Sequence, residues 1–238
     1  MQSRLFEEQQ RDVLRRINAQ RSMKALPMID LFNVPEWINR YVNAGLPDYM
    51  RIVSEGAQQQ NIIFSLGVSF DLSKIQPWID NRVAFWATRV NEETGRLLVQ
   101  EIEEAIEHGE STRQMQRRIE SVFDFSDVIR SERIARTETQ AMLNEAAVET
   151  YKQSGVVQQK IWLATRDDRV RDTHLEADQQ VVALETNFIV GGEAISHPGE
   201  GSPSNAINCR CTVAPVIVRR AWKPPLMALL ENSNGTEK

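Results

Sequence analysis

The chain has 238 residues, of which 41% are hydrophobic and 26% are charged, and its formal net charge is −5. This length allows a substantial core in one domain or two, and the acidic balance excludes a surface built throughout to wrap nucleic acid. No apolar run approaches the roughly 20 residues that span a bilayer, and residues 1–8 lack the apolar core of a signal peptide. We therefore expect a protein that is made in the cytoplasm and has no membrane partner.

Residues 1–72 are predicted to form a helical docking region. Residues 3–24 contain no glycine or proline and carry only a thin apolar stripe, which suits a helix that docks on a partner. A second helical segment at residues 35–64 has aromatic side chains at helical spacings, and Pro47 indicates a break within it. These aromatic residues are Trp37, Tyr41 and Tyr49. We expect their face to offer hydrophobic surface to a partner.

Residues 73–155 are predicted to form longer helices. Ser73 and Ser111 are each followed three residues later by glutamine, the spacing of a capping box, so a helix is expected to open at each. The last helix is expected to start near Ser126. It should end at Gly155, because glycine readily adopts the left-handed conformation that closes a helix.

After Gly155 the pattern changes to short β-like runs separated by turn-forming residues. These runs are residues 159–164, 181–184 and 212–218. We therefore expect an α+β fold, in which a mainly helical N-terminal two-thirds precedes a small, β-rich and turn-rich module at residues 156–218. Residues 219–238 are expected to form a flexible tail.

Both cysteines of the chain, and two of its three histidines, lie in the segment from Arg171 to Cys211. In a reducing cytoplasm, thiols separated by one residue should stay free, since a disulfide between them would close an unusually small ring. One interpretation is a zinc site, whose candidate ligands are His174, His197, Cys209, Cys211 and Asp178. The alternative is a buried turn with unreactive thiols, because Cys-x-Cys is a weaker metal motif than Cys-x-x-Cys.

A catalytic interpretation of the same segment is less well supported. His174-Leu175-Glu176 followed by two cysteines is similar to the first half of the zinc deaminase signature, in which glutamate shuttles protons. The second half differs, since Asn208 replaces the proline before Cys209 and the cysteines are one residue too close. No phosphate-binding glycine loop or Ser-His-Asp order stands out. We therefore assign no catalytic residue.

An ordered set of motifs runs from the last predicted helix to the second cysteine. It begins with Ile134-Ala135-Arg136-Thr137-Glu138, continues through Asn144, Tyr151, Gly155, Trp162, Asp168, Arg171, His174, Asp178, Phe188 and Pro198-Gly199, and ends in Asn208-Cys209-Arg210-Cys211. In this order and spacing, over about residues 85–215, the chain resembles the phage Mu F-like, or SPP1 gp7-like, head morphogenesis proteins. Gln179 departs from the pattern, because these proteins usually have glycine there.

The resemblance implies a minor head protein of a tailed phage or prophage, which acts in procapsid assembly beside the portal and is not an enzyme. Its implied partners are the portal protein, the scaffold or the major capsid protein, and its implied location is the virion head, after synthesis in the host bacterial cytoplasm. Residues 73–218 would form the Mu F-like domain. The stretch after Cys211 is short, so we expect it to lack the toxin domain that some relatives carry there.

Several matched residues are expected to be structural. A polar stripe on the last predicted helix should dock that helix against the β-rich module. Its residues are Arg133, Thr137, Gln140 and Asn144, with Arg136 and Glu138 beside them. Asp168 and Arg171 are expected either to orient the turn at His174 or to form a solvated charge cluster. The set is completed by Trp162, Asn208 and Arg210.

Basic residues, nearly all arginines, concentrate at residues 11–24 and 113–136. They could make a local contact with packaged DNA or with an acidic portal surface. Such runs are more often solvated helix faces paired with neighbouring acidic residues. A metal-dependent enzyme or a DNA-binding protein packaged in the head is therefore the alternative to a role in assembly.

Overall fold

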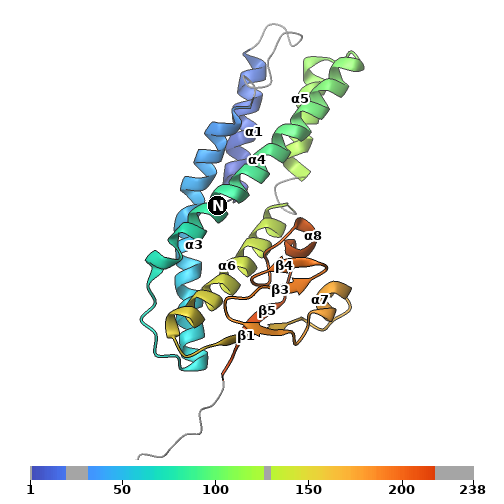
Figure 1. Cartoon of the computed structure of the whole chain (residues 1–238). Coiled ribbons are helices and arrows are strands. Elements are labelled where there is room, and N and C mark those ends of the chain that lie inside the picture. Colours follow the sequence, from blue (N-terminus) through green and yellow to red (C-terminus); the bar gives the residue numbers. More distant parts are fainter. Residues whose placement is uncertain (1, 20–31, 126–129, 218–238) are drawn as a thin grey trace, which may run out of the picture.

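The computed structural model describes residues 2–19, 32–125 and 130–217 (Figure 1). Its helical part consists of α1 (Gln2–Asn18), α3 (Val34–Phe64), η2 (Leu72–Lys74), α4 (Gln76–Glu107), α5 (Thr112–Phe125) and α6 (Ser131–Ser154). It is followed by β1 (Gln159–Leu163), α7 (Asp172–Glu176), β2 (Val181–Ala183), β3 (Phe188–Val190), β4 (Glu193–Ile195), α8 (Pro203–Ala206) and β5 (Thr212–Val216). The predicted α+β class is confirmed. The predicted helix start near Ser126, residues 20–24 and the predicted tail at 219–238 lie outside the described residues.

α3 is continuous through Pro47, where the sequence predicts a break. Gly45 and Tyr49, on either side of this proline, are both buried. A Cβ on Gly45 would lie 3.0 Å from the Val83 side chain of α4, so the two helices pack closely there. The prediction of a break is wrong because this packing holds the helix together where one backbone donor is missing.

Two of the three helix ends predicted from capping patterns are found at the expected residues. α4 begins later than Ser73, because the Asp71 side chain accepts a hydrogen bond from the Ser73 backbone and caps the short η2 instead. At the second capping pattern, the Gln114 side chain accepts a hydrogen bond from the Ser111 backbone at 2.9 Å, and α5 begins at the next residue. Gly155 closes α6 with a φ of 65°, as predicted.

One end of the molecule is a helical arm, formed by α1, α5 and the parts of α3 and α4 that pack against them (residues 2–19, 32–44 and 84–125). Its core is apolar, and the buried side chains include Phe6, Val13, Ile17, Trp37, Tyr41, Trp86, Leu98, Ile102, Met115 and Ile119. The Phe6 ring of α1 contacts Tyr41 of α3 edge-on, at 5.9 Å between centroids. The thin stripe of α1 therefore docks on helices of its own chain.

This packing corrects the expectation of an aromatic docking face. Trp37, Tyr41 and Tyr49 are buried, so they offer no surface to a partner. The reason is tertiary: α1, α4 and α6 cover the face of α3 that carries these residues. The spacing of aromatic residues indicates an apolar face but does not say which helix covers it.

A buried carboxylate joins three helices below the arm. Arg82 of α4 donates two hydrogen bonds to Glu138 of α6, at 2.7 and 2.9 Å, and the hydroxyl of Tyr49 on α3 donates a third at 2.9 Å. Burial and the Glu138 charge raise the pKa of Tyr49, which keeps this hydroxyl a donor. Arg82 also donates to the Gly199 carbonyl oxygen at 3.3 Å, which extends the network toward the strands.

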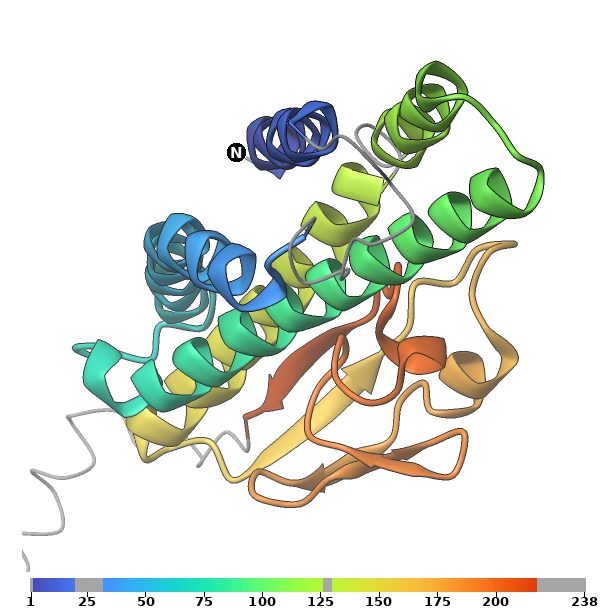
Figure 2. The same ribbon diagram turned by 90° about the horizontal axis from the view of Figure 1, so that it is seen from above.

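The C-terminal module, residues 156–217, packs against α6 (Figure 2). It contains an antiparallel sheet in the order β2-β1-β5 and a separate antiparallel pair, β3-β4. Gly191 and Gly192 connect β3 to β4 with φ values of 58° and 82°, the backbone that a two-residue hairpin turn requires. Within the described residues, no helix is long and apolar enough to cross a membrane.

Candidate metal centre

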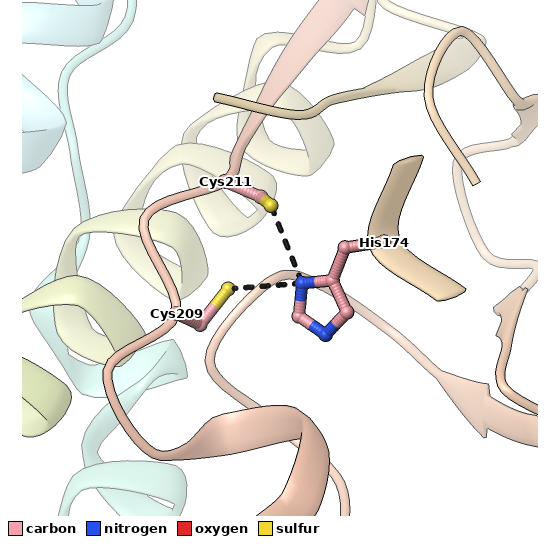
Figure 3. Close-up of side chains that lie close together, drawn as sticks. All are labelled: His174, Cys209 and Cys211. Atoms are coloured by element: carbon pink, nitrogen blue, oxygen red, sulfur yellow. Dashed lines mark hydrogen bonds between the residues drawn. The ribbon is translucent and has the colours of Figure 1, made fainter. Parts of the chain in front are cut away.

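Three residues with metal-binding side chains meet inside the C-terminal module. His174 lies on α7, and Cys209 and Cys211 lie on the segment that leads into β5 (Figure 3). All three are buried, and one ligand atom from each lies within 4.8 Å of the other two. We call these residues the His–Cys cluster. Both cysteines are free thiols.

The imidazole of His174 is oriented so that one nitrogen faces both sulfur atoms. Its Nδ1 lies 3.4 Å from Sγ of Cys211 and 3.7 Å from Sγ of Cys209. Its Nε2 lies 3.3 Å from Oδ1 of Asn205, whose Nδ2 donates to the Val190 carbonyl oxygen. Because this second bond fixes Oδ1 as the acceptor, Nε2 carries the proton and the Nδ1 lone pair points at the two sulfurs.

The two thiols influence each other's ionisation. Hydrogen bonds from the Cys209 thiol and the Thr165 backbone lower the pKa of Cys211, although burial acts in the opposite direction. Its hydrogen bond with Cys211 and its own burial raise the pKa of Cys209. The pair therefore favours a Cys211 thiolate that accepts a hydrogen bond from the Cys209 thiol.

The other two candidate ligands have different partners. Nε2 of His197 lies 3.0 Å from a carboxylate oxygen of Glu145, and its Nδ1 lies 3.0 Å from the Pro198 carbonyl oxygen. Asp178 accepts hydrogen bonds from the Ala164 backbone at 2.8 Å and from Arg166 at 2.7 Å. The structure thus brings together three of the five candidate ligands and places these two outside the His–Cys cluster.

Helix α6 supports the segment that carries the cysteines. Asn144 accepts a hydrogen bond from the Val213 backbone at 2.9 Å and donates to the carbonyl oxygens of Cys211 and Pro198, at 3.1 and 3.0 Å. Gln140 also donates to the Cys211 carbonyl oxygen, at 2.6 Å, and the Thr137 hydroxyl accepts from the Asn208 backbone. Three residues of the predicted polar stripe therefore contact the module. Arg133, the fourth, is exposed.

The loop after β1 is held against the same segment by ionic contacts. Asp167 pairs with Arg210, with one hydrogen bond of 2.6 Å. Asp168 is exposed. Arg171 donates to the Ile207 carbonyl oxygen, so it ties the start of α7 to the end of α8. Of the two residues expected to orient the turn at His174, Arg171 thus makes a contact beside it, whereas the ionic contact of this loop is made by Asp167.

Aromatic rings complete the surroundings of the cluster. Trp162 of β1 is buried and lies edge-on to His174, with 5.5 Å between ring centroids. Its other ring neighbour is Phe188 of β3, also at 5.5 Å. Asn208 adopts a φ of 56°, a left-handed conformation that asparagine tolerates, and this turn places Cys209 next to His174.

Two buried polar residues of the C-terminal module are not identified from the sequence. Asn205 lies in the Gly/Pro/Ser-rich passage before the cysteines and is recognised only through its contact with His174. Lys160 is buried on β1 and donates to the Ser196 carbonyl oxygen at 2.8 Å. The alternation of side chains along β1 could have indicated its burial, because it places Lys160 on the same face of the strand as Trp162.

Many of the arginines in the two concentrated runs have acidic partners. Arg118 makes hydrogen bonds of 2.9 Å to Glu101, Glu104 and Glu110. Arg15 and Arg16 both pair with Asp12. These contacts favour solvated, ion-paired helix faces over a basic surface that binds DNA.

Two comparisons with known proteins match part of this chain. NAD(+)–arginine ADP-ribosyltransferase EFV of Enterococcus faecalis is 38% identical over 89 residues, which are 36% of this chain and 18% of that protein. The chain thus matches less than a fifth of that relative's length. No solved structure matches the chain. The family described as phage Mu protein F like protein matches residues 98–214, which include α5, α6 and nearly all of the C-terminal module. Over this segment the chain is similar to the phage Mu protein F like family.

Proposed function

We propose that this protein is a minor head protein of a tailed phage or prophage, which acts in procapsid assembly in association with the portal and is not an enzyme. The observation that carries the proposal is the family match over residues 98–214. Such a protein is made in the host cytoplasm and remains in the virion head. The scaffold and the major capsid protein are the other candidate partners.

Exposed aliphatic side chains at one end of the described structure suit this association. Ile62 and Ile63, in the last turn of α3, are 69% and 65% exposed. Val156 and Ile217 are 65% and 47% exposed, and they follow the ends of α6 and β5 at the same end of the molecule (Figure 1). We call these four residues the end patch. Exposed aliphatic side chains gathered in this way are typical of protein-binding surfaces.

Point substitutions test the association better than removal of the N-terminal helices. α3 packs on both α4 and α6, so deleting residues 1–64 would open the core along with any docking surface. The Ile62→Lys/Ile63→Lys double variant changes only exposed side chains. Gln58→Lys/Gln59→Lys is the matched control, because these residues are exposed on the same helix and the added charge is equal.

The experiment is co-sedimentation of tagged full-length chain with portal-containing proheads and with virions. We expect wild type and the glutamine control to associate, and the isoleucine variant to lose most of its association. Wild type that associates with neither particle would refute the proposed function. Full association of the isoleucine variant would move the docking surface elsewhere, and association lost only at high salt would indicate a phosphate or acidic partner of the arginines.

An enzymatic role is the second candidate, and the similarity to an ADP-ribosyltransferase favours it. The assay is incubation of the full chain with NAD⁺ and an arginine-containing acceptor, followed by measurement of released nicotinamide. We expect no release above a heat-treated sample. Release that rises with protein concentration would replace the assembly role with a catalytic one.

A further inference from the structure

The His–Cys cluster has no part in the docking surface, since its three side chains are buried inside the C-terminal module. We propose that Nδ1 of His174 and the Sγ atoms of Cys209 and Cys211 bind one Zn²⁺ ion, with a water molecule as the fourth ligand. The donor set of two sulfurs and one imidazole is one that zinc prefers over harder cations.

The distances fit a single ion among the three atoms. With Zn–S bonds of about 2.3 Å and a Zn–N bond of about 2.0 Å, tetrahedral geometry separates nitrogen from each sulfur by roughly 3.5 Å. The observed separations from His174 Nδ1 are 3.4 Å and 3.7 Å, and all three atoms lie within 4.8 Å of one another. An ion can therefore enter with only small movements of these side chains.

The imidazole is held in the form that a metal requires. Zinc binds a nitrogen with a free lone pair, and the opposite nitrogen of such a histidine usually donates to an oxygen. Here Nε2 faces Oδ1 of Asn205, and the bond from Asn205 to the Val190 carbonyl keeps that amide from turning over. This relay leaves the Nδ1 lone pair directed at the two thiols.

The fourth position opens toward a small cavity. Its volume is about 10 Å³, and its lining includes His174 and Cys211 together with Thr165, Arg171 and Asn208. This is the space that one water molecule occupies. Two thiolates balance the charge of the ion, and the protons they release on binding pass to solvent.

The ion would fasten α7 to the start of β5. That segment is already bonded to α6 through Asn144 and Gln140, so the metal would close a chain of contacts from α7 to the helices. The consequence is stability of the module. Binding at the end patch should not depend on it, so this proposal and the proposed function fail separately.

The first test is the metal content of the full chain, purified without chelator from zinc-supplemented cells. We expect about one zinc per chain in wild type, measured by elemental analysis. His174→Ala and Cys211→Ser should each retain less than a tenth of this. His108→Ala is the control, because His108 is the exposed third histidine and should leave the zinc content unchanged.

Variants that fail to fold would lose metal for a trivial reason, so the second test uses wild type. Chelator-treated protein is titrated with Co²⁺, and a tetrahedral site with thiolate ligands gives visible ligand-field bands and a sulfur-to-cobalt charge-transfer band. We expect saturation at one equivalent, and zinc affinity about 10–100-fold weaker in Asn205→Leu. Wild type without zinc and without these bands would overturn the proposal, as would undiminished binding by Cys211→Ser.

Discussion

The helical arm and the C-terminal module are stabilised by different kinds of interaction. In the arm, four helices bury aliphatic and aromatic side chains against one another, and some of the ion pairs lie on exposed helix faces. In the module, side chains of α6 and of the loops bond specific backbone atoms, as Asn144 does with Val213, Cys211 and Pro198. Apolar packing tolerates exchange of residues of similar volume, whereas such a bond pattern requires particular side chains.

This difference explains where the recognisable motifs lie. Asn144, Asn208 and Gly199 each meet a stereochemical requirement that few other residues can meet. The apolar residues of the arm leave only a periodic pattern. A segment built on specific bonds therefore carries a readable signature, and a helical bundle carries mainly its helix period.

We expect the largest loss of stability from a substitution at Gly199, where a loop of the module meets α6. This glycine has a φ of 93°, and a Cβ there would lie 2.9 to 3.1 Å from the backbone and Cβ of Ala141 on α6. We expect Gly199→Ala to lower the free energy of unfolding by about 4 kcal/mol, of which the left-handed backbone accounts for about 1–2 kcal/mol and the clash for the rest. Urea unfolding followed by circular dichroism measures this.

Gly67→Ala is the matched control for that measurement. Gly67 also has a positive φ, 66°, but a Cβ there would meet nothing within 4 Å. It should cost only the backbone contribution, about 1 kcal/mol. Equal losses in the two variants would show that the close approach of the Gly199 loop to α6 has little energetic weight.

A buried asparagine in each region allows a direct comparison. We expect Asn144→Leu to cost about 3 kcal/mol or more, because it leaves the Val213 N–H and carbonyl groups of the module without this partner. Asn91→Leu, in the arm, should cost about 1–2 kcal/mol, since it removes mainly one bond from Gln9 and adds apolar volume to an apolar core. The same unfolding measurement applies. A larger loss at Asn91 would contradict the distinction drawn between the regions.

The sequence predicts those parts of the fold that depend on neighbouring residues. The helix end at Gly155 and the cap at Ser111 are local, and both are confirmed. The β3-β4 hairpin is also local, and the pair Gly191-Gly192 between apolar runs signals it, although the β-runs identified from the sequence do not include it. Burial of Trp37 depends instead on α1 and α4, which no local pattern reveals.

The site divides in the same way. The clustering of cysteine and histidine identifies His174, Cys209 and Cys211 as candidates, and the structure places them together. His197 is near in sequence, yet its ring faces Glu145 and Trp78. The choice among ligands depends on loop paths between residues 174 and 209, and residue spacing does not determine those paths.

The smallest predicted effect is a gain in stability, at the one position that departs from the family pattern. Gln179 has a φ of 65°, a conformation that costs a residue with a Cβ about 1 kcal/mol more than glycine, and its side chain is exposed. Gln179→Gly should therefore raise the free energy of unfolding by roughly 0.5–1 kcal/mol.

The neighbouring Gln180 is the control, since its side chain bonds both the N–H and the carbonyl oxygen of Ile189. Gln180→Gly should instead lower stability by about 1–2 kcal/mol. Thermal unfolding of the two variants and of wild type measures both effects. A loss of stability in Gln179→Gly would mean that contacts of the Gln179 side chain stabilise the fold by more than the left-handed backbone costs.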